Sequence, residues 1–248
     1  MKSNDELKDD FDDDDELDEF DDEEFEGDED EEDDETEPLS EEEQALAEEW
    51  YERKTTLMEQ ALGAEHDMVM HAIIPYELGG GLDLYYFPNG IPGTGVATKE
   101  LSSFPDAGSN NAVYLAYELV MFTRHPLSLD DANDEKTPFG KAHDNINAIL
   151  NLIAPYSEDA ELNPRETCEF PDDMEDVGGK CLIFDGYTSY ADEDDPQGEM
   201  EDFGLLLLME IFRSEMEYAR EQGGAELIEK LKAAGHYPYS DMDRAPVV

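Results

Sequence analysis

One stretch limits the fold more than any other: residues 7–38 read LKDDFDDDDELDEFDDEEFEGDEDEEDDETEP, and most of their side chains are carboxylates. Like charges at this density repel one another, and the few apolar residues cannot offset the entropy lost on ordering. We therefore expect residues 1–38 to form a disordered acidic tail outside any folded domain. The tail contains spaced apolar residues: Leu7, Phe11, Leu17, Phe20 and Phe25.

These spaced apolar residues leave two interpretations of the tail open. Acidic segments of this kind can lie on a basic surface and insert their rings into its pockets. Alternatively, the tail only keeps the protein in solution. The sequence alone does not decide between a binding arm and a solvated one.

The acidity is not confined to the tail. The chain has 69 acidic and 15 basic residues, a formal net charge of −54. Residues 1–38 carry −23 of this charge, and residues 39–248 carry the other −31. So acidic a chain is a poor direct ligand of nucleic acid, because phosphates repel carboxylates. A basic protein partner explains the acidity of the body, and so does general solubility or a salt-rich habitat.

The remaining 210 residues are enough for one folded domain with a sizeable core, expected over residues 39–248. No apolar run reaches the ~20 residues of a membrane helix, and no export signal is recognisable at the N-terminus. We expect a cytoplasmic protein without a membrane partner. Its cysteines, Cys168 and Cys181, are then expected to be reduced thiols.

The folded part is predicted to begin with a helix. Ser40 followed by Glu43 is a capping-box pattern, and Gly63 is a typical helix stop. The helix is expected to reach about Leu62 and to pack a wide apolar face on a sheet. That face comprises two stripes: Leu46, Trp50, Leu57 and Ala61, and Ala47, Tyr51, Met58 and Leu62.

Strands are predicted over residues 68–76, 82–87, 180–187 and 203–211, with a short one over residues 95–101. Residues 112–124 (AVYLAYELVMFTR) fit either a helix or a strand that is buried on both faces. A second helix should start at Thr137–Pro138 and end before Pro155, followed by a polar stretch to Gly179. Two more helices are expected over residues 212–222 and 225–234. This order predicts an α+β fold with a central mixed sheet flanked by helices.

A search for catalytic and cofactor motifs returns little. The glycine clusters lack the P-loop pattern and the strand–helix context of a dinucleotide site. His66 and His71 would face opposite sides of a strand, and the acidic loops at 130–135 and 192–199 lack EF-hand spacing. No nucleophile motif is present. We therefore expect no cofactor, no dedicated metal site and no enzymatic activity.

The region from His71 to the C-terminus resembles the suppressor of fused domain family, in its compact bacterial form. The resemblance rests on the strand segment MVMHAIIPYE with its glycine turn, on YELVMF (117–122), and on GLLLLMEIF (204–212). The two C-terminal helices and the final YSDMDRAPVV complete it, whereas TGVATKEL (94–101) departs from the family pattern. The resemblance implies an α+β domain in which YELVMF is a strand, and it implies no catalysis.

Animal members of that family sequester zinc-finger transcription factors, and bacterial members are mostly regarded as immunity proteins that neutralise toxins. The resemblance thus implies a cytoplasmic binding protein that covers a basic toxin or effector. An acidic chaperone or regulator of basic proteins is the alternative, and an uncharacterised hydrolase is a third reading. The expected partner contacts are Phe11, Phe20, Phe25, Asp192, Glu193, Asp194 and Asp195.

The C-terminal region offers a second polar surface, formed by Tyr187, Tyr190, Tyr237, Tyr239, Asp241 and Arg244. The simpler interpretation is structural. In that interpretation, Asp241 or Asp243 forms an ion pair with Arg244 and ties down the C-terminus.

Overall fold

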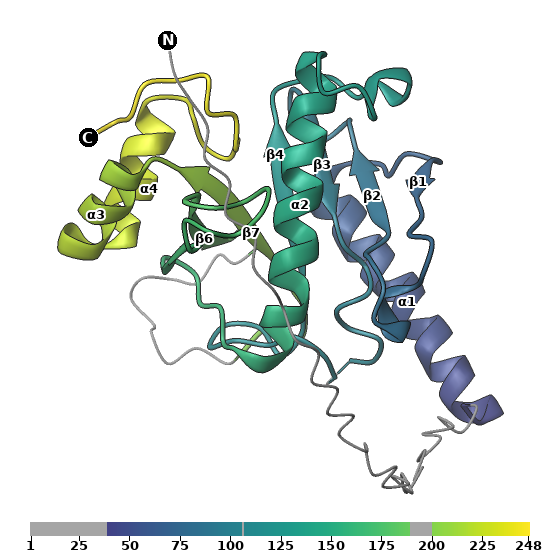
Figure 1. The fold of residues 1–248 in the computed structure, drawn as a ribbon. Helices are drawn as coiled ribbons and strands as arrows, with labels where there is room; N and C mark the ends of the chain where they lie inside the picture. Colours follow the sequence, from purple (N-terminus) through teal and green to yellow (C-terminus); the bar gives the residue numbers. More distant parts are fainter. Residues whose placement is uncertain (1–38, 106, 189–199) are drawn as a thin grey trace, which may run out of the picture. The chain divides into compact units, whose positions relative to one another are not determined.

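Seven strands form one mixed sheet in the order β1-β2-β3-β4-β7-β6-β5 (Figure 1). The computed structural model describes residues 39–105, 107–188 and 200–248, so the predicted tail lies outside the described residues. The strands are β1 (Val69–Met70), β2 (Leu84–Phe87), β3 (Thr94–Ala97), β4 (Tyr117–Thr123), β5 (Thr167–Glu169), β6 (Cys181–Gly186) and β7 (Gly204–Ile211). Strands β4 and β7 run parallel, and the other neighbouring pairs are antiparallel.

Helices cover both faces of the sheet, which confirms the predicted α+β class. They are α1 (Glu41–Leu62), α2 (Pro138–Asp159), α3 (Arg213–Gln222) and α4 (Gly224–Ala233). Helix α2 crosses one face, and α1 lies behind the sheet (Figure 1). The side chains of β7 contribute to three buried apolar clusters. Leu206 packs on the α2 side of the sheet, Leu207 on the α1 side and Met209 under α3 and α4. None of the described helices is long and apolar enough to span a lipid bilayer.

The ambiguous segment around residues 112–124 is a central strand from Tyr117 onward. All seven residues of β4 are buried. Leu119 packs on the α2 side and Val120 on the α1 side, as expected for a strand covered by helices on both faces. The strand found here is the one that the family resemblance implied.

Helix α1 begins with the predicted capping box. The backbone N–H of Glu43 donates to the Ser40 hydroxyl at 3.3 Å, and that of Ser40 donates to the Glu43 carboxylate at 2.8 Å. The predicted apolar face is wrong at Leu46 and Tyr51, which are exposed, and correct further along the helix. One row of α1 side chains is fully buried, and Leu57 and Ala61 beside it are partly buried against the same core cluster. The buried residues are Trp50, Lys54, Met58 and Leu62.

Helix α2 also starts as predicted, with the Thr137 hydroxyl accepting from the N–H of Gly140 at 3.0 Å. Its predicted end before Pro155 is wrong, because the helix continues to Asp159. A proline this near the end removes only one backbone bond. The last turn is held against the sheet by buried Ala154 and Ser157.

Two further expectations about strands are wrong. Residues 68–76 form only the two-residue edge strand β1. The chain leaves the sheet because Asp83 binds His71 at 2.6 Å and accepts the N–H of Ala72 at 2.9 Å. The polar stretch before Gly179 contains an unpredicted strand, β5, which pairs with β6 at the other edge.

Candidate functional site

A crevice forms where the parallel strands β4 and β7 separate. The two strands pair only as far as Val120 opposite Leu207. Beyond that point the C-terminal segment, which follows α4, lies between the ends of the two strands and bonds to both. Ser240 donates its N–H to the Phe122 carbonyl at 2.8 Å, and its hydroxyl accepts the N–H of Glu210 at 3.1 Å. The carboxyl ends of parallel strands are a common place for ligand sites, because the elements that follow diverge there.

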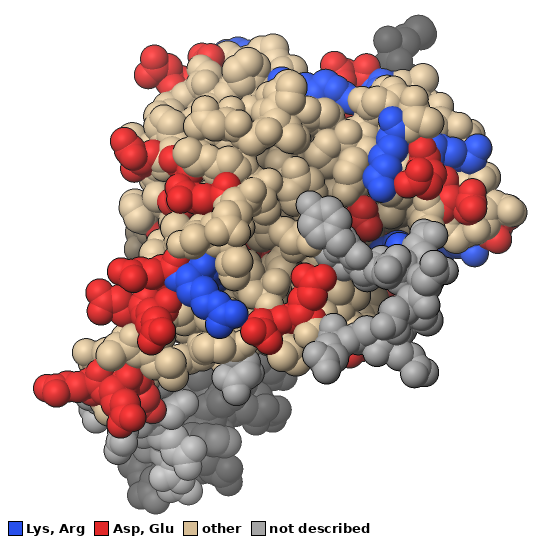
Figure 2. Space-filling view, turned by 180° about the vertical axis from the view of Figure 1, so that it is seen from behind, with Lys and Arg blue, Asp and Glu red and all other residues tan. Residues whose placement is uncertain are grey.

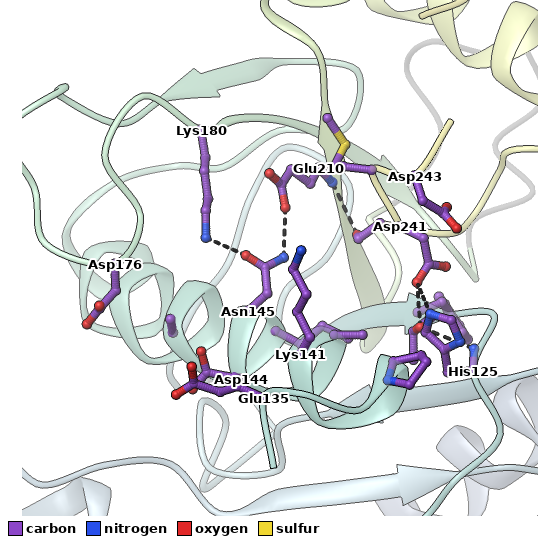
Figure 3. Close-up of a pocket in the computed structure, with 18 residues that line it drawn as sticks. His125, Glu135, Lys141, Asp144, Asn145, Asp176, Lys180, Glu210, Asp241 and Asp243 are labelled. Carbon is purple, nitrogen blue, oxygen red and sulfur yellow. Dashed lines mark hydrogen bonds and ion pairs between the residues drawn. The ribbon is translucent and has the colours of Figure 1, made fainter. Parts of the chain in front are cut away.

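The crevice has a volume of about 860 Å³ and is bordered by β4, β7, the first half of α2 and the C-terminal segment (Figure 3). We call it the acidic crevice. Lys141, Lys180 and His125 also line it, and both lysines point into it in Figure 3. Its six acidic residues are Glu135, Asp144, Asp176, Glu210, Asp241 and Asp243.

The inner wall is held by a chain of hydrogen bonds around Asn145 of α2. The Asn145 amide donates to the Glu210 carboxylate at 2.7 Å, and its oxygen accepts from the Lys180 ammonium group. Glu210 is 8 % exposed. Burial raises the pKa of Glu210, although the Asn145 hydrogen bond and the charge of Lys180 oppose the shift. This wall is therefore fixed before any ligand arrives.

Asp241 forms a second fixed point of the crevice. Its carboxylate accepts from the Thr123 hydroxyl at 2.6 Å and from the N–H of Arg124 at 2.7 Å. The His125 ring nitrogen Nε2 lies 3.6 Å from the same carboxylate. The predicted pairing of Arg244 with Asp241 or Asp243 is thus wrong. Asp241 joins the C-terminal segment to the end of β4, and Asp243 forms no ion pair with another described residue.

Arg244 instead binds Glu215 in the first turn of α3. The guanidinium group reaches the two carboxylate oxygens at 2.6 and 2.8 Å, and both side chains are buried. Burial would raise the pKa of Glu215, but Arg244 and the N–H groups of Phe212 and Val247 hold it below its usual value. The prediction that an ion pair ties down the C-terminus holds with a different carboxylate.

The remaining members of the predicted C-terminal surface mostly point inward. The Tyr237 hydroxyl donates to Asp185 at 2.9 Å, and the Tyr239 hydroxyl donates to the carbonyl of Pro92 at 2.7 Å. The Tyr187 ring packs against that of Phe122 at an interplanar angle of 39°, with centroids 4.9 Å apart, and Tyr190 lies outside the described residues. Of these tyrosines, Tyr187 packs directly against a residue that lines the crevice, Phe122.

The mouth of the acidic crevice carries carboxylates that the described part of the chain leaves without a cation. Glu135, Asp144, Asp176 and Asp243 are exposed, and none of them forms an ion pair with another described residue. We call these four residues the rim. Because the inner wall is already hydrogen-bonded, the rim is the part that is free to bind a ligand.

The chemistry of the crevice favours organic cations. Carboxylates bind the charged heads of lysine and arginine, and Pro138 and Met242 offer apolar surface to the alkyl stems. Within residues 39–105, 107–188 and 200–248, no group of three potential ligands could hold a metal ion. The crevice thus places exposed carboxylates beside apolar side chains.

The sequence did not identify this site. Its predicted contacts, namely Phe11, Phe20, Phe25, Asp192, Glu193, Asp194 and Asp195, all lie outside the described residues. The structure instead brings together Asn145, Lys180 and Glu210 from three separate elements. One signal was present, since Glu210 is the single charged residue in the apolar strand β7.

No known family's sequence profile matches the chain, and no curated protein matches it. Solved structures do. One is a chain in the Sufu–Fu complex crystal structure, at 14 % identity and a TM-score of 0.48, covering 82 % of this chain and 92 % of that one. Another is a putative suppressor of fused homologue from Neisseria gonorrhoeae FA 1090, at 13 % identity and a TM-score of 0.49, covering 81 % and 98 %.

Both structures carry the name of the family that the sequence resemblance predicted. The similarity concerns the fold. At TM-scores below 0.5 it does not decide what this chain binds, which has to follow from the chain's own residues.

Proposed function

We propose that this chain is a non-enzymatic protein-binding domain of the immunity type. In this proposal it acts in the bacterial cytoplasm and neutralises a basic toxin or effector by covering its basic surface. The observation that carries the proposal is the acidic crevice, whose hydrogen-bonded inner wall lies below a rim of carboxylates that form no ion pair with another described residue.

The charge balance of the domain supports a basic partner. Residues 39–248 contain 44 acidic and 13 basic side chains. Eight of these 13 basic residues already pair with carboxylates of the same chain. On the rear face, carboxylates gather along α1, whereas lysine and arginine gather toward α3 and α4 (Figure 2). Most carboxylates of the described residues therefore form no ion pair with another described residue.

The proposed mechanism is occlusion with electrostatic steering. Long-range attraction between the acidic surface and a basic partner raises the association rate. Lysine or arginine side chains of the partner then enter the crevice, where the rim carboxylates replace their bound water. These contacts slow dissociation. A toxin whose basic cleft is covered in this way no longer reaches its own anionic substrate.

The experiment is capture of the partner by the full-length protein, followed by co-expression of both proteins. Cells that produce the captured partner should survive only when this chain is also produced. Their survival without it would contradict the immunity function. Association measured by stopped flow should slow steeply as salt rises, and a rate independent of salt would contradict steering.

A further inference from the structure

A second exposed feature lies at the β1 edge of the sheet. Between β1 and β2 the chain presents three large apolar side chains to solvent: Ile73 is 101 % exposed, Leu78 75 % and Ile74 56 %. We call these residues the β1 edge patch. Apolar side chains that gather on a surface commonly mark an interaction site.

The loop that carries the patch is tightly folded. Gly80 and Gly81 donate their N–H groups to the carbonyls of Pro75 and Ile74 at 3.0 and 3.1 Å. A Cβ atom on Gly80 would lie 1.9 Å from the Ile74 carbonyl oxygen, so only glycine allows this approach. The isoleucines are therefore held outward by the backbone, which lowers the entropy lost when a partner binds.

The space beside the patch is acidic. A crevice of about 560 Å³ is lined by Glu77, Glu100 and Glu158, together with Tyr76, and no lysine or arginine of the described residues lines it. Glu158 is held by the Tyr76 hydroxyl at 2.8 Å. We call this second hollow the Glu100 crevice.

Glu100 lies in this crevice as a half-buried carboxylate without a cation. It accepts the N–H of Asp83 at 2.8 Å. Burial raises its pKa to about 7, partly offset by that hydrogen bond, and the negative charges of Asp83, Glu118 and Glu77 raise it further. Asp83 in turn binds His71. A positive group placed beside Glu100 would relieve this repulsion.

We infer that the β1 edge patch and the Glu100 crevice together dock a protein segment that presents apolar side chains next to a lysine or arginine. Charge complementarity selects this occupant. A second copy of the chain would bring like charges together, and an anionic lipid surface would be repelled by the same carboxylates.

The inference rests on the proposed function, because it describes a second contact for the same basic partner. The two contacts are distinct in space. The Glu100 crevice borders Glu158 and the acidic crevice borders Asn145, so they flank opposite ends of α2. Thirteen residues of helix separate these positions by about 20 Å. A partner segment that reaches one crevice leaves the other to a different part of the partner.

The test uses the full-length chain with isoleucine methyl groups labelled for NMR, titrated at physiological salt. The probes are a peptide of alternating lysine and leucine and a matched peptide in which serine replaces each leucine. We expect the methyl signals of Ile73 and Ile74 to shift with the leucine peptide and to stay in place with the serine peptide. Equal shifts with both peptides would show attraction by charge alone and would overturn the inference.

A variant pair completes the test. Ile73→Ser with Leu78→Ser should weaken binding of the leucine peptide at least fivefold. Leu46→Ser, which changes an equally apolar and 47 % exposed residue on the opposite face, should leave binding unchanged. Unchanged affinity in the double variant would also overturn the inference.

The same titration separates this inference from the proposed function, because Ile146 lines the acidic crevice. A shift of Ile146 without Ile73 and Ile74 would overturn the edge-patch inference and support the proposed function. Shifts of Ile73 and Ile74 without a shift of Ile146 would support the edge-patch inference and count against the proposed function. If none of the three signals moves, both proposals fail.

Discussion

Arg244 in the C-terminal segment binds both carboxylate oxygens of Glu215 in α3, at 2.6 and 2.8 Å, and the two side chains are 3 % and 0 % exposed. Glu215 also accepts the N–H of Val247 at 2.9 Å. This contact fixes the C-terminal segment, and the same segment supplies Asp241 and Asp243 to the acidic crevice. One buried ion pair therefore supports the geometry of the candidate site.

Replacing Arg244 should destabilise the domain strongly. Arg244→Met leaves the buried carboxylate of Glu215 without its cation, which typically costs about 3–5 kcal/mol of unfolding free energy. Urea unfolding followed by circular dichroism measures the loss. The control is Arg213→Met, since Arg213 pairs with Glu169 at the surface and is 50 % exposed. Such a pair contributes less than about 1 kcal/mol, and equal losses in both variants would contradict the assigned role of Arg244.

A second buried pair predicts a similar contrast within one helix. Lys54 of α1 donates to Glu118 of β4 at 2.9 Å, and Glu118 also accepts from the Thr98 hydroxyl at 2.6 Å. Lys54→Met should lower the unfolding free energy by about 3–5 kcal/mol, because it leaves the buried Glu118 carboxylate without its cation.

The neighbouring Arg53 provides the control for Lys54, since it pairs with Asp202 at 3.2 Å and is 54 % exposed. Arg53→Met should cost no more than about 1 kcal/mol in the same urea experiment. If Lys54→Met unfolds at the same urea concentration as Arg53→Met, the buried pair does not stabilise the fold as described.

The helix starts show what local sequence determines. The cap patterns predicted the starts of α1 and α2 correctly, at Ser40 with Glu43 and at Thr137 with Pro138. A cap depends only on residues within one turn, so local sequence is enough to predict it. The apolar run of β7 was equally clear, since a strand covered on both faces is apolar throughout.

Other features depend on distant residues and escaped prediction. Ile73 and Ile74 have the composition of a buried strand, and their exposure follows from contacts of the preceding residues with Asp83. Nothing in the local sequence marks Lys54 as buried, since its partners Glu118, Lys99 and Ser102 lie 64, 45 and 48 positions away. The rim carboxylates look like any of the 69 acidic residues until the fold brings four of them to one crevice.

Glu100 predicts a pH dependence of stability. Its pKa in the folded chain is about 7, above the usual 4.5, so the folded state binds more protons than the unfolded state between these values. The unfolding free energy of the wild-type protein therefore falls as pH rises from about 4.5 to 7. Above pH 7 this contribution of Glu100 stays constant.

Glu100→Gln removes this loss. The variant should exceed the wild type in unfolding free energy at pH 8, by an amount on the order of 1 kcal/mol once solvent screening of a half-buried group is allowed for. At pH 4.5 the two proteins should differ little. Urea titrations at both pH values measure this, and a variant that is less stable at pH 8 would contradict the description of Glu100.

Removing residues 1–38 separates the acidic tail from the site. The truncated chain should unfold at the same urea concentration as the full chain, because α1 begins with its own cap at Ser40. It should still retain the partner, more weakly, since −31 of the net charge of −54 remains. Complete loss of capture would place the function in the tail, whereas unchanged capture would make the tail only a solubilising segment.

The most direct test of the central claim compares two charge-neutralised proteins in quantitative capture of the partner. One carries Asp144→Asn with Asp243→Asn in the rim, and its control carries Glu48→Gln with Glu49→Gln on exposed turns of α1. Each protein loses two negative charges. The account predicts that a basic partner is retained by the wild type and the α1 variant, and is reduced at least fivefold with the rim variant. Equal retention by the two variants, or a retained partner that is itself acidic, would contradict it.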